Sequence, residues 1–285
     1  MDKITVKAYA KINIGLDVTG KTDNGYHLLK TVMQQVDLYD DVTVEKCDEG
    51  IKFECGSSEV PLDDTNLAVK AARLMIDTYN IKEGVKIVLK KNIPVAAGMA
   101  GGSTDGAAAI TGINEVFNLG LTLQDMMDIG VKIGADVPFC IHGGCALAEG
   151  IGEKLTVLDN KADINVLIVK PPINVSTAFV YKNLNLPALK HPDMESVITG
   201  IKTGDIKLIS ENMGNVLESV TSSEYEIIGE LKNAILEAGA DGSLMSGSGP
   251  TVFGIFSDKE KCLAAENILK EKYPDSFVKA TGIIR

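Results

Sequence analysis

The run from Pro94 to Ala109 joins a glycine-rich loop directly to an alanine-rich segment that favours a helix. Glycines let backbone N–H groups approach an anion closely, and the start of the following helix adds free N–H groups and the positive end of the helix dipole. Ser103 or Thr104 is expected to cap this helix or to bind a metal ion held by phosphate. The loop itself comprises Pro94, Val95, Ala96, Ala97, Gly98, Met99, Ala100, Gly101, Gly102, Ser103 and Thr104.

The pattern favours a phosphate-binding loop, and a tight strand-to-helix connection with glycines for close packing is the alternative. A Walker-type loop needs a Gly-Lys-Ser/Thr ending, and a dinucleotide-binding fingerprint needs G-x-G-x-x-G. Neither string occurs in this loop. The choice between a phosphate site and a plain connection therefore depends on the rest of the chain.

Apolar residues alternate with polar ones from Ile4 to Val18, which predicts a half-buried β-strand. Lys11 and Asn13 emerge on the same face of that strand, about 7 Å apart at the usual rise per residue. Both side chains can therefore line one pocket, and a solvated strand face is the alternative.

Asp136 stands on a connection after a predicted helix over residues 123–133, with Gly134 as the C-terminal stop of that helix. Pro138 follows two residues later, so a helix N-cap is the competing interpretation of Asp136. A third glycine cluster, Ser246 to Pro250, includes Gly247 and Ser248 and is typical of a hairpin turn. Such a turn can also close its backbone N–H groups over a phosphate or a substrate.

Together these segments resemble the superfamily of galactokinase, homoserine, mevalonate and phosphomevalonate kinases, over nearly the whole chain. The central motif of that superfamily, a proline followed by Gly-Leu and a run of small and hydroxyl residues, resembles Pro94 to Asp105, with Met99 in place of the usual leucine. Leucine and methionine have similar volumes, so this exchange is expected to matter little. Four further motifs match one branch of the superfamily: Ala8 to Asn13, Asn24 to His27, Gly134 to Phe139 and Met245 to Gly249.

The resemblance to this branch implies an ATP-dependent kinase that phosphorylates the 2-hydroxyl of a cytidine-diphosphate-linked methylerythritol, in the non-mevalonate route to isoprenoid precursors. It also implies an α+β fold of two domains, an N-terminal one like ribosomal protein S5 and a C-terminal ferredoxin-like one. We expect these domains at residues 1–158 and 159–285. The alternatives are a kinase for homoserine or a mevalonate derivative, and a nucleotide-binding regulator descended from a kinase.

By matching position, the resemblance makes Asp136 the general base that accepts the proton of the attacking hydroxyl, with Lys11 beside it. The loop from Pro94 to Thr104 would bind the ATP phosphates together with Mg²⁺, and Ser103 is the candidate metal ligand. Asn66 corresponds to a position near the nucleotide base, although a helix cap explains it equally well.

The cytidine end of the substrate is expected to contact Tyr26, His27 and Tyr181, by ring stacking and by hydrogen bonds to the polar edge of the base. The alternative for Tyr26 and His27 is a turn followed by an ordinary strand. Asn13, Gly247 and Ser248 complete the expected substrate site. Aromatic residues make up only 5% of the chain, so few side chains can serve for stacking.

The composition agrees with two modest domains: the chain has 285 residues, of which 45% are hydrophobic. A net charge of −11, without a basic run, argues against a nucleic-acid partner. No apolar stretch reaches 18 residues and the start lacks a signal-peptide pattern, so we expect no membrane partner. Five cysteines without a CxxC pair indicate a reduced, cytoplasmic compartment. We expect a monomer or a homodimer.

Periodicity predicts strands near residues 4–18, 29–46, 51–55, 85–91, 145–149, 164–169 and 277–284, and a hairpin over 243–256. Helices are predicted near residues 66–79, 104–117, 123–133, 224–238 and 259–272. Residues 158–163 are the expected crossover between domains. This order predicts a helix-backed antiparallel sheet in the C-terminal half, and residues 187–205 are too polar and interrupted for an assignment.

Overall fold

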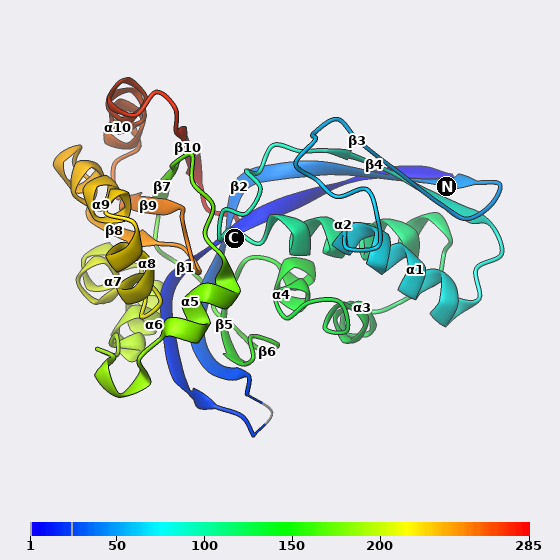
Figure 1. Cartoon of the computed structure of the whole chain (residues 1–285), viewed down its shortest axis with the longest axis horizontal. Helices are drawn as coiled ribbons and strands as arrows, with labels where there is room; N and C mark the ends of the chain where they lie inside the picture. Colours follow the sequence, from blue (N-terminus) through cyan, green and yellow to red (C-terminus); the bar gives the residue numbers. More distant parts are fainter. Residues whose placement is uncertain (1, 24) are drawn as a thin grey trace. The chain divides into compact units, whose positions relative to one another are not determined.

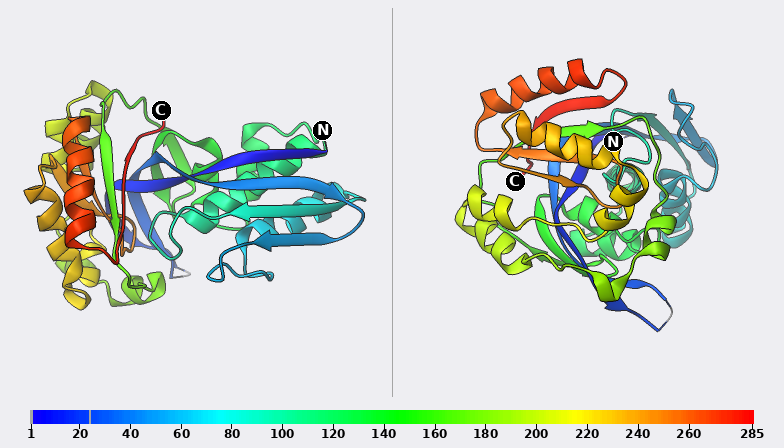
Figure 2. Two further views of the ribbon diagram at one scale, coloured as in Figure 1. Left: turned by 90° about the horizontal axis from the view of Figure 1, so that it is seen from above. Right: turned by 60° about the vertical axis from the view of Figure 1, so that its left-hand side comes forward.

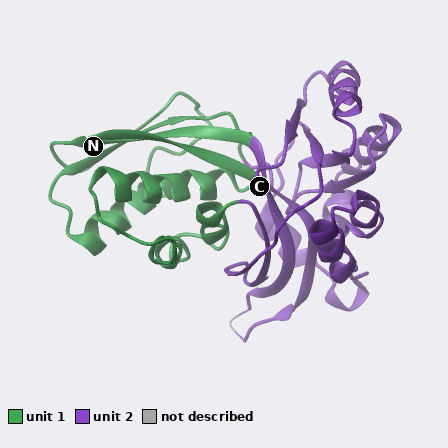
Figure 3. Cartoon of the chain, turned by 180° about the vertical axis from the view of Figure 1, so that it is seen from behind, with its two compact units in different colours: residues 1–10, 38–95, 100–143 green, residues 11–37, 96–99, 144–285 purple. Residues whose placement is uncertain are grey.

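The structure is a computed structural model that describes residues 2–23 and 25–285 (Figure 1). It forms two compact units, each discontinuous in sequence (Figure 3). The first unit consists of residues 1–10, 38–95 and 100–143, and the second of residues 11–37, 96–99 and 144–285. Two long strands, β1 (Lys3–Lys21) and β2 (His27–Cys47), contribute to both units. The division by contacts therefore differs from a single boundary after residue 158.

The first unit packs helices against a sheet. Strand β4 lies between β2, to which it is antiparallel, and β3, to which it is parallel. In the hydrophobic core of this unit, Val44 and Ile87 of the sheet pack with Met75 and Ile110 of two helices. Besides parts of β1 and β2, the unit contains β3 (Ile51–Cys55), α1 (Leu67–Tyr79), β4 (Gly84–Lys90), α2 (Gly101–Val116), α3 (Leu123–Gly130) and α4 (Val137–His142).

Local sequence signals explain where these helices begin. The Asn66 side chain accepts a hydrogen bond from the Ala68 N–H and caps α1. Thr122 and Asp125 form a reciprocal capping box at the start of α3. Helix α1 ends where Asn80 adopts a left-handed conformation, with φ of 52°.

The second unit contains a four-stranded antiparallel sheet of order β10-β7-β9-β8. Helices α9 and α10 cover one of its faces (Figure 2). This strand order, with a helix after β7 and before β10, is the ferredoxin-like arrangement. The members of the unit are β5 (Cys145–Gly150), β6 (Lys154–Val157), β7 (Asn165–Lys170), α5 (Thr177–Asn183), the 3₁₀ turn η1 (Leu186–Ala188), α6 (Met194–Thr203), α7 (Ile206–Asn212), α8 (Glu218–Glu224), α9 (Ile227–Glu237), β8 (Gly242–Met245), β9 (Val252–Phe256), α10 (Lys259–Lys272) and β10 (Phe277–Gly282).

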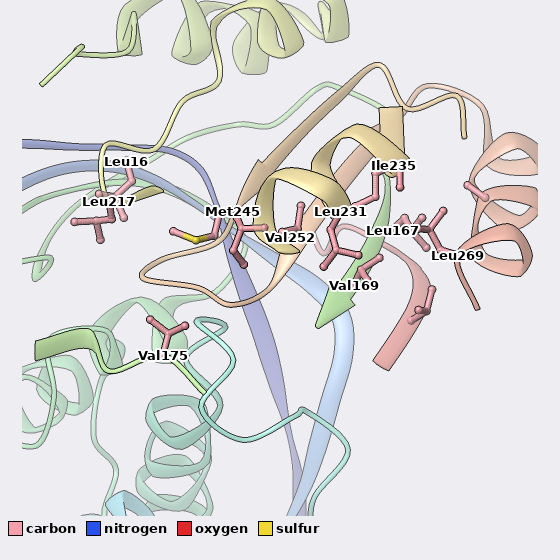
Figure 4. Packing of buried hydrophobic residues seen from close by; sticks show 14 of the residues in the cluster. Leu16, Leu167, Val169, Val175, Leu217, Leu231, Ile235, Met245, Val252 and Leu269 are labelled. Atoms are coloured by element: carbon pink, nitrogen blue, oxygen red, sulfur yellow. The ribbon is translucent and has the colours of Figure 1, made fainter. Parts of the chain in front are cut away.

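The core of the second unit reaches the turn between β8 and β9. Met245 and Val252, on either side of that turn, are fully buried, and Figure 4 shows them near Leu231 of α9. Close packing of this kind leaves little freedom to the chain that it flanks. The turn of residues 246–250 is therefore fixed at both ends by residues of the hydrophobic core.

Most predicted elements are confirmed, including the hairpin. Residues 158–163 form a connection without helix or strand, but they lie within the second unit and not between the two units. The helix predicted over 104–117 begins earlier, at Gly101, and the one predicted over 123–133 ends earlier, at Gly130. Gly134 is therefore not the residue that ends α3. Part of the unassigned stretch 187–205 forms α6, and α8 precedes the predicted helix, now α9.

Candidate active site

The glycine-rich loop between β4 and α2 has an unusual backbone. Ala96, Gly98 and Ala100 all adopt left-handed conformations, with φ of 52°, 70° and 57°. Ala100 is the N-cap of α2 and supplies no side-chain hydrogen bond, so the first turn of the helix keeps its N–H groups without a side-chain acceptor. Those donors suit an anionic ligand such as phosphate.

The prediction that Ser103 or Thr104 caps α2 is wrong. The left-handed Ala100 lets the helix begin at Gly101, which places both hydroxyl residues inside its first turn. The Thr104 hydroxyl donates instead to the Tyr9 carbonyl oxygen of β1, at 2.9 Å.

The bend of the loop packs against the turn after β8. The Ser246 hydroxyl donates to the carbonyl oxygen of Gly98 at 3.0 Å. A Cβ on Gly98 would lie 2.4 Å from the Ser246 carbonyl oxygen, and one on Gly247 would lie 3.0 Å from the Gly98 carbonyl oxygen. Two motifs far apart in sequence thus meet in the second unit, and both need glycine at the contact.

Lys11 and Asn13 belong to the same region and are buried, at 5% and 1% exposure. The Lys11 ammonium donates to Asn13 Oδ1 at 2.7 Å, and the Asn13 amide donates to the Thr31 hydroxyl at 2.9 Å. The Lys11 N–H also bonds to the Met99 carbonyl oxygen of the loop. A solvated strand face, the alternative for Lys11 and Asn13, is therefore wrong.

Asp136 precedes α4 in the first unit and occupies its N-cap position. Its side chain makes no capping hydrogen bond. The N-cap interpretation is therefore right about where Asp136 stands, but the carboxylate does not act as a cap. A Cβ on the nearby Gly134 would lie 3.9 Å from the Ser103 hydroxyl oxygen. The segment that carries Asp136 therefore passes close to the first turn of α2.

His27 and Tyr181 come together in the second unit. Their rings lie 4.9 Å apart between centroids and are tilted by 37°. Burial, with the charge of Lys21 as a smaller contribution, lowers the pKa of His27 from its ordinary value of 6.5. Its Nε2 atom is buried and has no hydrogen-bond partner in the structure. A buried polar atom of this kind is available for a ligand.

The other residues expected at the substrate lie in different settings. Tyr26 is 61% exposed, and Asn24, which opens its motif, lies outside the described residues. The Ser248 hydroxyl bonds to that of Thr177 at 2.8 Å, at the start of α5, the helix that carries Tyr181.

Asn66 uses both ends of its amide inside the protein. Its oxygen caps α1 and its nitrogen donates to the Pro61 carbonyl oxygen at 2.8 Å. The cap interpretation is thus confirmed, whereas a contact with the nucleotide base stays a prediction. A Cβ on Gly102 would lie 3.9 Å from Leu67, so the start of α1 is near the glycine-rich loop.

A buried charge cluster of Asp40, Lys91 and Asp105 was not predicted from the sequence. The Lys91 ammonium bonds to Asp40 at 2.6 Å and to Asp105 at 2.7 Å. Burial, together with the neighbouring Asp40, raises the pKa of Asp105 to about 8 against the attraction of Lys91. Burial opposes the charge of Lys91, but the attraction of Asp105 and Asp40 outweighs it and raises the pKa of Lys91. A signal was present: the residues that follow Asp105 are small and apolar, a buried setting for a carboxylate.

Among residues 2–23 and 25–285, no three His, Cys, Asp or Glu side chains group in a way that could hold a metal ion. No helix in that same part of the chain is long and apolar enough to cross a membrane.

The fold is a two-domain α+β arrangement in which a glycine-rich loop enters a helix and suits phosphate, as expected of an enzyme of the phosphotransferase class. Comparison with known families agrees. The model described as "GHMP kinases N terminal domain" matches residues 66–144, and that described as "GHMP kinases C terminal" matches residues 197–275. The chain belongs to the GHMP kinase family, whose members are small-molecule kinases.

Full-length relatives support this assignment. A 4-diphosphocytidyl-2-C-methyl-D-erythritol kinase of Clostridium botulinum (strain Alaska E43 / Type E3) is 53% identical over 97% of this chain and 99% of its own length. A protein of the same name from Acetivibrio thermocellus is 50% identical over 99% of this chain and 100% of its own length.

Solved structures show the same fold. A crystal structure of 4-(cytidine 5'-diphospho)-2C-methyl-D-erythritol kinase has a TM-score of 0.83 at 28% identity, over 98% of this chain and 99% of that one. The homoserine kinase of Cytophaga hutchinsonii has a TM-score of 0.82 at 22% identity, over 99% of this chain and 95% of that one. The second likeness concerns the fold alone.

Proposed function

We propose that this protein uses ATP to phosphorylate the 2-hydroxyl of 4-diphosphocytidyl-2-C-methyl-D-erythritol, giving the 2-phosphate and ADP in the non-mevalonate route to isoprenoid precursors. Two relatives that are 50% or more identical, and that match this chain over 99% or more of their own length, are named for this kinase activity. The structural observation that best supports a cytidylyl substrate is the buried Nε2 atom of His27, which has no hydrogen-bond partner and whose ring lies beside that of Tyr181. A neutral imidazole there can bond to the polar edge of a cytosine, and Tyr181 offers a ring for stacking.

In the proposed reaction, the hydroxyl oxygen of the acceptor attacks the γ-phosphorus of ATP, and the bond to the bridging oxygen of ADP breaks. Asp136 accepts the hydroxyl proton. Lys11 stabilises negative charge on the transferring group, and its bond to Asn13 fixes the direction of the ammonium. Lys11 lies in the second unit and Asp136 in the first, so their joint role rests on the matching motifs.

The ATP phosphates are proposed to bind the N–H groups of the loop from Ala96 to Thr104. Mg²⁺ neutralises phosphate charge when it is bound. The Ser103 hydroxyl, in the first turn of α2, fits as a single oxygen ligand, because Mg²⁺ usually takes its other ligands from phosphate and water. Tyr26, Gly247 and Ser248 are proposed to contact the cytidylyl substrate, and Asn66 the nucleotide base. A reduced cytoplasmic setting and a monomer or homodimer remain predictions.

The test is ADP release with Mg²⁺-ATP on addition of 4-diphosphocytidyl-2-C-methyl-D-erythritol, with homoserine, mevalonate and galactose as parallel acceptors. Saturable turnover of the cytidylyl substrate alone is the expected result. Turnover of another acceptor instead would assign the protein to a different activity within the GHMP kinase family. ATP binding without turnover of any acceptor would favour a regulator.

A further inference from the structure

The buried cluster of Asp40, Lys91 and Asp105 connects three separate segments of the first unit. Asp40 lies in β2, Lys91 directly follows β4, and Asp105 is in the second turn of α2. The exposed fractions of their side chains are 0%, 8% and 5%, so water contributes little to their solvation. A buried ion cluster of this kind is weak support for stability, because well-packed apolar side chains often do as well. Its role is better sought in what it positions.

Lys91 and Asp105 lie on the two sides of the glycine-rich loop, so their ion pair closes that loop at its base. Asp40 also holds the entry to the loop: its Oδ1 accepts the N–H groups of Asn92 at 2.5 Å and Ile93 at 2.8 Å. A Cβ on Gly101 would lie 3.1 Å from the Lys91 nitrogen. The ammonium therefore lies directly against the first residue of α2.

We propose that Lys91 is a positioning residue for ATP: through Asp40 and Asp105 it fixes both ends of the loop, so that the loop N–H groups are aligned before the phosphates bind. This inference rests on the proposed role of the loop. A loop whose ends are held loses less conformational freedom when it binds, which strengthens binding without a direct contact. The Asp105 Oδ1 atom is buried without a hydrogen-bond partner, so the carboxyl group is held to Lys91 through Oδ2 alone.

The first test replaces Lys91 with methionine and measures binding of a non-hydrolysable ATP analogue by calorimetry, alongside KM for the cytidylyl substrate. We expect Lys91→Met to weaken binding of the analogue by about tenfold or more and to change KM for the cytidylyl substrate by less than about twofold. Lys90→Met is the matched control, because Lys90 is the preceding residue, is 75% exposed and makes a 3.8 Å pair with Asp41. It should leave both quantities unchanged.

A second pair of variants covers the case in which Lys91→Met does not fold. Asp105→Asn keeps an oxygen that can accept from Lys91, whereas Asp105→Ala does not. We expect the asparagine variant to bind the analogue within about threefold of the unsubstituted protein, and the alanine variant to bind about tenfold more weakly.

Unchanged binding of the analogue by folded Lys91→Met or Asp105→Ala would overturn the inference. An equal loss of analogue binding and cytidylyl-substrate affinity would also overturn it, since that pattern indicates general loosening. The binding comparison does not depend on which acceptor is phosphorylated. Failure of the proposed substrate and failure of this inference therefore give different results.

Discussion

The Ser246 hydroxyl donates to the Gly98 carbonyl oxygen at 3.0 Å, and this bond joins the turn after β8 to the glycine-rich loop 148 residues earlier. Because Gly98 and Gly247 both face this contact, the loop and the turn can approach only without side chains there. The shape of the proposed phosphate site therefore depends on a residue pair that no local pattern connects.

Gly98→Ala should lower the free energy of unfolding by roughly 3 kcal/mol or more, because its Cβ would collide with the Ser246 carbonyl oxygen at 2.4 Å. Gly120→Ala is the control: its φ is also +70°, but nothing lies within 4 Å of the added Cβ. The control should lose only about 1 kcal/mol from left-handed strain. Denaturant unfolding measures both variants, and equal losses would contradict the close contact.

Asp136→Asn should reduce kcat by about 10²- to 10⁴-fold, because an amide cannot accept the proton of the attacking hydroxyl. KM for ATP should change little, since the loop is intact. Asp128→Asn, at an exposed carboxylate bonded to Gln124, is the control and should keep full activity. A folded Asp136→Asn enzyme with ordinary turnover would exclude Asp136 as the base.

Tyr181→Ala should raise KM for the cytidylyl substrate by about tenfold, the effect of losing one stacking ring. Tyr181→Phe keeps the ring and should stay close to the unsubstituted enzyme. Phe179→Ala removes a 40% exposed ring from the same helix and serves as a control for α5. Equal KM values for Tyr181→Ala and the unsubstituted enzyme would remove Tyr181 from the proposed site.

His27 should titrate below pH 6.5, since burial and Lys21 lower its pKa. The unfolded chain then binds more protons than the folded one as pH falls through 6.5, so this histidine lowers folding stability towards acid pH. The chain has three histidines, so proton NMR can follow each ring, with His27→Gln to assign its signal. A His27 midpoint at or above 6.5 would contradict the buried, neutral imidazole.

The sequence was sufficient for elements with a clear period. The alternation from Ile4 to Val18, the apolar residues of α9 and the glycines after Met245 each predicted an element that the structure contains. The start of α2 was wrong because the left-handed conformation of Ala100, an alanine, gives no signal in the letters. The short helices from α5 to α8 depend on tertiary packing more than on their own periodicity.

Candidate site residues that belong to a local motif could be predicted from the sequence, whereas contacts between residues far apart in the chain could not. Lys11, Asn13 and Asp136 were predicted as single residues from their motifs, but the bond from Lys11 to Asn13 and the burial of these two side chains needed the fold. Asp40 and Lys91 are 51 residues apart, and charged residues usually face water. Only the fold reveals that they share a buried cluster with Asp105.

The interleaving of the two compact units within the chain has a consequence for protein engineering. A cut after residue 143 would leave the second unit without residues 11–37 and 96–99, and strand β5 would lose its partner in β2. Any other single cut also divides at least one of the units. We therefore expect that no single cut in the gene yields two intact folding units, and that recombining this enzyme with a relative by domain exchange requires several crossovers.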